Sequence, residues 1–137
     1  MLTVMRIPTA SQKICVHRNM LKKIRPRERA FLQGQRTIRA IDDADFATVA
    51  CVHGHAVGGG FGLVLACDLR VVEKNTLLCF PEIDIGVPVP WGLAPLLIRD
   101  AGLPVAKELM WMGSDITARR AMRLGLVNRV CEAGVQN

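Results

Sequence analysis

The sequence contains no tyrosine, and aromatic residues make up only 4% of its 137 residues. This scarcity argues against a nucleic-acid surface built from stacked aromatic side chains. No apolar run reaches the roughly 20 residues that a transmembrane helix needs, because Asp, Arg, His or Pro interrupts each one. Half of the residues are nevertheless hydrophobic, which is typical of a soluble globular chain with an aliphatic core. The length is enough for one domain and too short for two ordinary ones.

The sequence also lacks a C-x-x-C motif, and its first 27 residues lack acidic side chains. The five cysteines are odd in number and include no C-x-x-C pair, which argues against a zinc ribbon or a disulfide framework and for a reducing compartment. Residues 1–27 hold seven of the 18 Lys and Arg but no Asp or Glu. We interpret residues 1–27 as a basic, poorly ordered arm, with a transit peptide or a phosphate-binding arm as alternatives. Cytoplasmic residence is the default, and an organellar matrix is the alternative.

The hydrophobic periodicity of the remaining chain predicts alternating helices and strands, and therefore an α/β fold. Strand TVACV is β-rich and apolar, as in a strand buried on both faces. Prolines predict a loop with fixed turns over residues 81–92. Helices are expected at residues 28–44, 61–68, 93–102, 104–113 and 117–125, and strands at 48–52, 69–72, 77–80 and 126–130.

A glycine run, GHAVGGGFG at residues 54–62, separates an expected strand from an expected helix. Glycine there lets the backbone approach a ligand closely, and the N–H groups of a first helical turn have no intrahelical partner. Such groups can hold a phosphate or a developing oxyanion. The spacing G-G-G-x-G fits neither the dinucleotide-binding fingerprint nor a P-loop. The alternative is that the glycines only let the helix pack tightly against the strand.

Three segments carry a specific combination of motifs: VHGHAVGGGFGLVLACDLRV, FPEIDIGVP and KELMWMGSDITARRAMRLGLVNRV. In order and spacing they resemble the crotonase family of enoyl-CoA hydratases and isomerases, from about residue 30 to residue 132. The resemblance implies a spiral of β-β-α units. Residues 28–137 would form its central portion, truncated before the family's C-terminal helices. It also implies an acyl-CoA substrate, no cofactor beyond that coenzyme A, no metal, and a homo-oligomer, as a trimer or hexamer.

The resemblance also assigns roles to individual residues. Gly59 matches the position whose backbone N–H stabilises the thioester enolate, and Gly58 and Gly60 beside it are expected to bind substrate. Glu82 matches the catalytic acid/base of the family's Pro-Glu motif. Hydratases of the family carry a second glutamate just after the glycines, where this sequence has Gly62. The resemblance therefore favours the chemistry of Δ3,Δ2-enoyl-CoA isomerases, with Glu82 as the single proton shuttle.

Two alternative functions stay open. Nothing in residues 1–47 matches the segment that supplies the family's other oxyanion donor, and the strand that precedes that segment is not evident. The chain can therefore be a catalytically inactive remnant or an assembly subunit. The basic run at residues 18–29 can contact phosphates, as in RNA-binding relatives. We nevertheless expect neither nucleic acid nor a membrane as the partner.

Several further side chains are candidates with an ordinary structural explanation beside them. Asp84 can act as a second acid if residues 79–84 continue as a strand, because it would then share a face with Glu82; otherwise it caps a turn. Trp91 and Trp111 can line an acyl pocket or simply belong to the core or an interface. The two histidines of the HGH motif can bind a metal only with further ligands.

Overall fold

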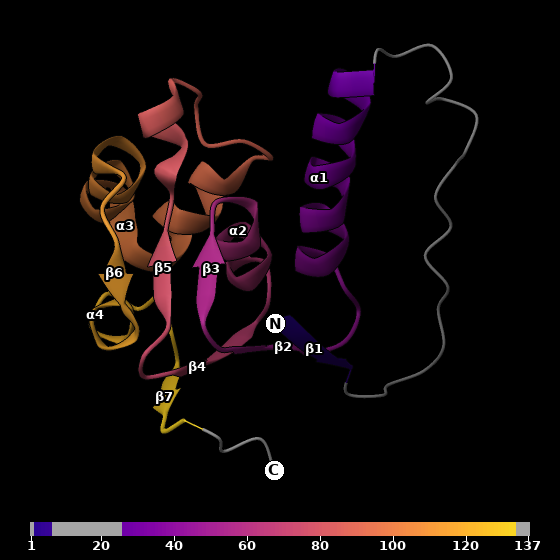
Figure 1. Cartoon of the computed structure of the whole chain (residues 1–137). Coiled ribbons are helices and arrows are strands. Elements are labelled where there is room, and N and C mark those ends of the chain that lie inside the picture. Colours follow the sequence, from indigo (N-terminus) through magenta and orange to yellow (C-terminus); the bar gives the residue numbers. More distant parts are fainter. Residues whose placement is uncertain (1, 7–25, 134–137) are drawn as a thin grey trace.

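The computed structural model describes residues 2–6 and 26–133, so most of the expected basic arm, residues 7–25, lies outside the described residues (Figure 1). None of the described helices is long and apolar enough to cross a membrane. The elements are β1 (Leu2–Arg6), α1 (Pro26–Asp42), β2 (Thr48–Val52), β3 (His55–Val57), α2 (Gly59–Leu65), β4 (Leu69–Glu73), β5 (Leu77–Cys79), the 3-10 helix η2 (Pro81–Ile85), α3 (Leu93–Met112), β6 (Ile116–Thr117), α4 (Ala118–Arg123) and β7 (Arg129–Cys131).

The described strands form two sheets, with strand orders β1-β2-β4-β7 and β3-β5-β6. β2, β4 and β7 are parallel to one another, as are β3 and β5. Twice the chain passes from the larger sheet to the smaller one and then into a helix: β2 leads into β3 and then α2, and β4 leads into β5 and then α3 (Figure 1). This repeated strand-strand-helix order confirms the α/β prediction. It also brings the loops that follow β3 and β5 to the same edge of the smaller sheet.

The first strand corrects the sequence-based expectation. The sequence predicts an arm without regular structure over residues 1–27, but Leu2–Arg6 pairs antiparallel with β2, with Leu2 opposite Val52 and Arg6 opposite Thr48. Five residues are too few to show a clear period, and the strand exists because β2 supplies its hydrogen-bond partners. The predicted helices at 93–102 and 104–113 are joined in α3, which is broken at Gly102 with φ 80° and ψ 163°.

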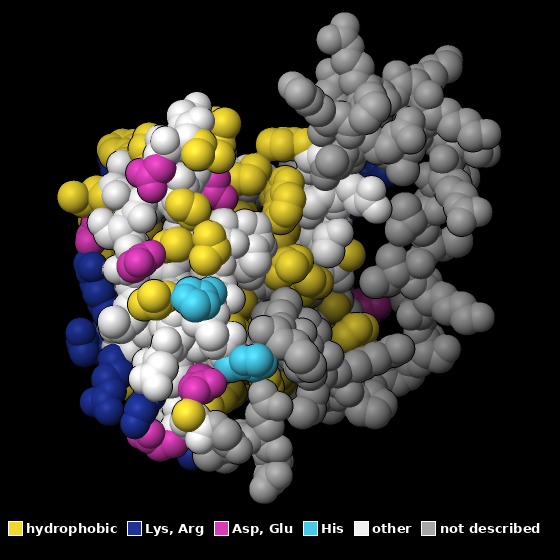
Figure 2. Space-filling model, in the orientation of Figure 1, with side chains coloured by type: hydrophobic (Ala, Val, Ile, Leu, Met, Phe, Trp, Pro, Cys, Tyr) yellow, Lys and Arg dark blue, Asp and Glu magenta, His cyan; other side chains and the backbone are white. Residues whose placement is uncertain are grey.

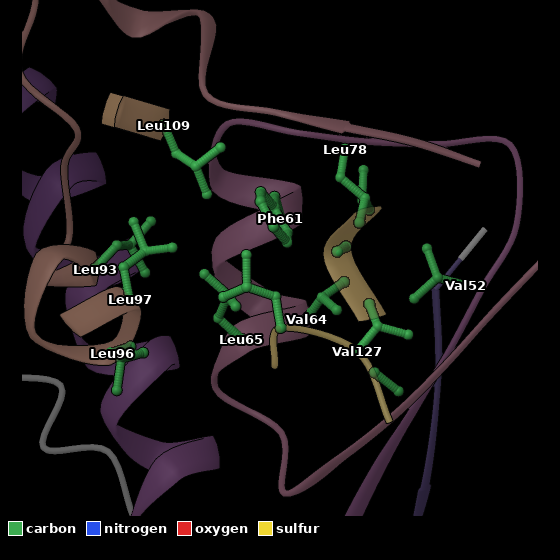
Figure 3. Packing of buried hydrophobic residues seen from close by; sticks show 14 of the residues in the cluster. Val52, Phe61, Val64, Leu65, Leu78, Leu93, Leu96, Leu97, Leu109 and Val127 are labelled. Carbon is green, nitrogen blue, oxygen red and sulfur yellow. The ribbon is translucent and has the colours of Figure 1, made fainter. Parts of the chain in front are cut away.

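The core lies between α2 and the elements around it. Phe61, Val64 and Leu65 of α2 point toward side chains from α3 and from both sheets (Figure 3). The ring of Phe61 stacks on that of Phe80, with centroids 4.8 Å apart. Phe80 comes directly before η2, so this pair fixes the start of η2 against the start of α2. Helix α1 packs on α2 from the other side (Figure 1).

A buried arginine ties the ends of several elements together. The Arg70 guanidinium, in β4, donates to the carbonyl oxygens of Leu65 (3.0 Å), Cys67 (3.0 and 3.2 Å) and Leu126 (3.3 Å). Its Nη1 also lies 2.6 Å from Oδ2 of Asp100 in α3. The carbonyl oxygens belong to the end of α2 and the segment after α4. One charged side chain therefore holds the elements that surround the core.

We expect Arg70→Met to lower the free energy of unfolding by about 3–5 kcal/mol, because three carbonyl groups lose their buried donor and the half-buried Asp100 carboxylate keeps only Arg99 as a partner. Urea denaturation measures this loss. Lys74→Met is the matched control, because the ion pair of Lys74 with Glu132 is exposed and should change stability by less than about 1 kcal/mol. Equal effects of the two substitutions would contradict the role given to Arg70.

A second polar contact joins the starts of β2 and β4. The backbone N–H and the hydroxyl of Thr48 both donate to Oδ2 of Asp68, each at 2.7 Å, and the Asp68 N–H donates to the Thr48 hydroxyl at 2.9 Å. These bonds favour the ionised carboxylate, so the Thr48 backbone N–H, followed by its hydroxyl, lowers the pKa of Asp68. The contact therefore stabilises the fold only while Asp68 carries its charge.

Because the pKa of Asp68 is lower in the folded chain than in the unfolded one, its stabilisation is complete above the ordinary aspartate pKa and is lost as the pH falls through the lowered value. We expect the unfolding free energy of the native chain to fall more steeply than that of Asp68→Asn when the pH is lowered from about 6 to about 3. Denaturant titrations across this range measure both slopes. Equal slopes would show that the contact does not depend on the charge.

Candidate active site

The glycine run forms a tight turn between β3 and α2. Gly58 has φ 52° and ψ −121°, a backbone conformation that residues with a side chain rarely adopt. Its N–H donates to the Cys79 carbonyl at 2.9 Å, and its own carbonyl accepts from the Gly62 N–H at 3.0 Å. Helix α2 begins at Gly59, and the N–H groups of its first turn have no acceptor within the helix. The turn thus presents backbone donors at a fixed place beside β5.

Glu82 reaches this turn from η2. It is only 8% exposed, and its Oε2 has no hydrogen-bond partner within residues 2–6 and 26–133. A Cβ added to Gly58 would lie 2.7 Å from Oε1 of Glu82, so the carboxylate occupies the space that a side chain at Gly58 would need. The structure therefore brings together Glu82 and Gly58, two of the residues expected to form the site.

The short helix η2 explains why Glu82 is held there. Pro81 is its first residue, and its end is closed by Gly86, whose N–H donates to the Ile83 carbonyl at 3.0 Å. Gly86 has φ 69°, the left-handed conformation that ends many helices. The N–H of Val87 also donates to the Glu82 carbonyl at 3.1 Å. The Glu82 carbonyl and the end of η2 are therefore fixed.

Asp84 does not join Glu82. Residues 81–85 form a 3-10 helix and not a strand, so residues two apart point in different directions. The Asp84 carboxylate is exposed and lies near Gly113, where an added Cβ would be 3.5 Å from both of its oxygen atoms. The suggestion that Asp84 shares a face with Glu82 is wrong. That suggestion required residues 79–84 to continue as a strand. The prolines and Gly86 favour a turn there instead.

Trp91 completes the surroundings of the turn, whereas Trp111 does not. A Cβ added to Gly59 would lie 2.2 Å from Cζ3 of Trp91, so the indole covers Gly59 as the carboxylate of Glu82 covers Gly58. Trp111 is 64% exposed on α3, with Nζ of Lys107 5.5 Å from its ring centroid. The sequence left both tryptophans as candidates, and no local signal marks Trp91 as the one beside the glycines.

The position of the missing second glutamate is filled by a neighbouring side chain. A Cβ added to Gly62 would lie 2.4 Å from Cδ1 and 2.7 Å from Cδ2 of Leu93 in α3. A glutamate at Gly62 would therefore collide with Leu93 unless the Leu93 side chain moved. Leu93 can pack in this place because residue 62 is a glycine and not a glutamate.

Cys79 contacts the turn through its backbone carbonyl, and its thiol is buried. Burial, followed by the Asp115 carboxylate, raises the pKa of the Cys79 thiol to about 11. The thiol is thus protonated at neutral pH and is a poor nucleophile. His53 and His55 follow β2 and begin β3, and in the described ranges no group of three or more His, Cys, Asp or Glu side chains is arranged to hold a metal ion.

Comparisons with known proteins show the family and the fold of the chain. The sequence matches the enoyl-CoA hydratase/isomerase family over residues 16–136. It is 33% identical over 99 residues to a short-chain-enoyl-CoA hydratase of Clostridium acetobutylicum and 35% identical over 99 residues to a crotonyl-CoA hydratase of Syntrophomonas wolfei. Each match covers 72% of this chain and 38% of the relative.

A solved enoyl-CoA hydratase/isomerase of Cupriavidus metallidurans superposes with a TM-score of 0.73 at 31% identity, covering 84% of this chain and 44% of that one. The chain belongs to the enoyl-CoA hydratase/isomerase, or crotonase, family, and its fold is the crotonase fold. It spans less than half the length of these relatives.

Two glycines of the turn make a matched pair of substitutions. Gly58→Ala should lower the free energy of unfolding by about 1–3 kcal/mol, because the backbone has positive φ and the new methyl group meets the Glu82 carboxylate. Gly60→Ala is the control: its Cβ would meet nothing within 4 Å, so stability should be unchanged or rise by up to about 1 kcal/mol. Thermal or urea unfolding measures both, and equal losses would contradict the described contact.

Proposed function

We propose that this chain binds acyl-CoA thioesters and performs isomerase-like enolate chemistry, with Glu82 as the proton shuttle and the Gly59 N–H as an oxyanion donor. The observation that supports this proposal best is the buried Glu82 carboxylate, with one oxygen unpartnered in the described part of the chain. A buried, unpaired polar group is costly, and one placed against a turn that presents backbone N–H groups calls for a functional explanation. A substrate proton and a thioester oxygen would provide the missing partners.

The proposed reaction moves one proton and one double bond within a 3-enoyl-CoA. The Glu82 carboxylate takes a proton from C2, and the electron pair of that C–H bond moves into the conjugated enolate. The negative charge gathers on the thioester oxygen, which accepts a hydrogen bond from Gly59. A preorganised donor of this kind lowers the barrier by about 2.7–4 kcal/mol. The protonated Glu82 then returns its proton to C4, leaving a double bond between C2 and C3 and an unchanged enzyme.

The packing around Gly62 favours this reaction over hydration. Several relatives are named as hydratases, and addition of water by the pair of carboxylates expected in such enzymes needs a second acid/base. Here Leu93 fills the space beside Gly62, and Asp84 points away from Glu82. A single carboxylate suffices for a proton that leaves one carbon and returns to another.

A role in assembly without chemistry is the second candidate. It is favoured by large apolar side chains that remain exposed around η2 and the end of α3: Ile85 at 75%, Trp111 at 64% and Met112 at 68%. Hydrophobic side chains gather at the top of the face shown in Figure 2, in the region of η2. Such a patch would be covered in a homo-oligomer. The two candidates differ in what a change at Glu82 should do.

Glu82→Gln should lower turnover of a 3-enoyl-CoA by about 10²- to 10⁴-fold, because the amide cannot accept and return the proton. Its binding of acetoacetyl-CoA, read as the rise in the thermal unfolding midpoint, should stay close to that of the native chain. Asp84→Asn is the matched control and should keep the native turnover.

Native turnover by Glu82→Gln would contradict the proposed shuttle. The assembly role would be favoured if the native chain unfolds cooperatively but neither acetoacetyl-CoA nor the 3-enoyl substrate raises its unfolding midpoint.

A further inference from the structure

Trp91 has a strained backbone inside a tight turn, in which the Leu93 N–H donates to the Pro90 carbonyl at 3.3 Å. Its φ is 63°, and it is the one non-glycine residue with positive φ in the described part of the chain. For a bulky side chain this conformation is unfavourable, and it persists only where the surroundings enforce it. It follows the proline-rich loop after η2 and directly precedes Gly92, which has φ 75°. The backbone conformation of Trp91 and Gly92 therefore fixes the position of the indole ring.

Two glycines on different helices make room for the indole. A Cβ added to Gly34 in α1 would lie 2.0 Å from Cε2 of Trp91, and one added to Gly59 in α2 would lie 2.2 Å from Cζ3. Glycine inside a helix is less favourable than alanine, so Gly34 destabilises α1 itself. The strained backbone of Trp91 and the glycine at position 34 are thus both needed for the observed position of the indole.

The ring and the catalytic carboxylate flank two consecutive residues. Glu82 lies against Gly58, and Trp91 lies against Gly59. The indole is only half-buried, so part of it faces outward beside the turn. In the proposed complex, the carbons next to the carbonyl of a thioester whose oxygen accepts from the Gly59 N–H would lie near this ring.

We propose that Trp91 is a specificity-determining residue of the site, and this inference rests on the proposed function. Its rigid indole forms the apolar wall beside Gly59. The wall contacts the CH₂ groups of an unbranched acyl chain and excludes acyl groups branched at C2. Glycine at 59 brings the wall as close to the backbone as van der Waals contact allows.

The first test compares substrates. Trp91→Ala should raise the ratio of kcat/KM for a 2-methyl-branched 3-enoyl-CoA to that for the unbranched thioester by about tenfold or more, which is the range of discrimination that one carbon gives in an apolar pocket. Trp91→Phe keeps a flat ring and should stay close to the native ratio. An unchanged ratio in Trp91→Ala, with turnover retained, would overturn the proposal.

The second test does not depend on turnover, and it covers the case in which Trp91→Ala fails to fold. The chain has two tryptophans, so Trp111→Phe leaves Trp91 as the single indole and Trp91→Phe leaves Trp111. Butyryl-CoA, a saturated thioester, should shift or quench the emission of Trp91 in Trp111→Phe and leave the emission of Trp111 unchanged in Trp91→Phe. Free CoA controls for effects of the nucleotide.

The outcomes separate the two proposals. If butyryl-CoA raises the unfolding midpoint of Trp111→Phe but leaves its emission unchanged, Trp91 does not line the site and only this inference fails. If neither butyryl-CoA nor acetoacetyl-CoA raises the midpoint of the native chain, the proposed function fails, and the specificity role fails with it. A midpoint rise together with a Trp91 response supports both.

Discussion

The close approach of a carboxylate to a bare backbone is the constraint on which the site depends. Oε1 of Glu82 occupies the space where Gly58 would carry a side chain, so only glycine permits the contact. The positive φ of Gly58 and the bond from its N–H to the Cys79 carbonyl hold the turn against β5. The same strand leads through Phe80 into η2 and so delivers Glu82. One short path of chain therefore supplies both the carboxylate and the acceptor that fixes the turn.

The rest of the fold keeps this arrangement rigid. The alternation of strands between two sheets returns the chain twice to the same edge, once for the glycine turn and once for Glu82. The stacked rings of Phe61 and Phe80 couple α2 to η2, and Arg70 holds the far end of α2 through the Leu65 and Cys67 carbonyls. A buried carboxylate with one oxygen unpartnered among the described residues is tolerated because surrounding contacts offset its cost.

Much of this could be predicted from the sequence, and the failures have physical causes. The apolar strand at residues 48–52 and the helix break at Gly102 were predictable because their signals are local. The strands β1, β3 and β6 were not: β3 and β6 have only three and two residues, β1 lies in a segment whose basic composition predicts an arm, and all three depend on pairing with a distant strand. Gly59 and Glu82 were found through the combined motifs, and their roles remain proposals. The contact of Trp91 with Gly34 joins a loop to a distant helix, and no periodicity encodes it.

The measurement that tests the central claim most directly is exchange of the C2 hydrogens of butyryl-CoA with solvent deuterium, followed by proton NMR. This exchange needs only enolate formation and a base that holds and returns the proton, and it needs no double bond. The account predicts exchange catalysed by the native chain and reduced to the solvent background in Glu82→Gln, with the thioester still bound. Equal exchange in the two proteins, or no exchange by a native chain that binds the thioester, would contradict it.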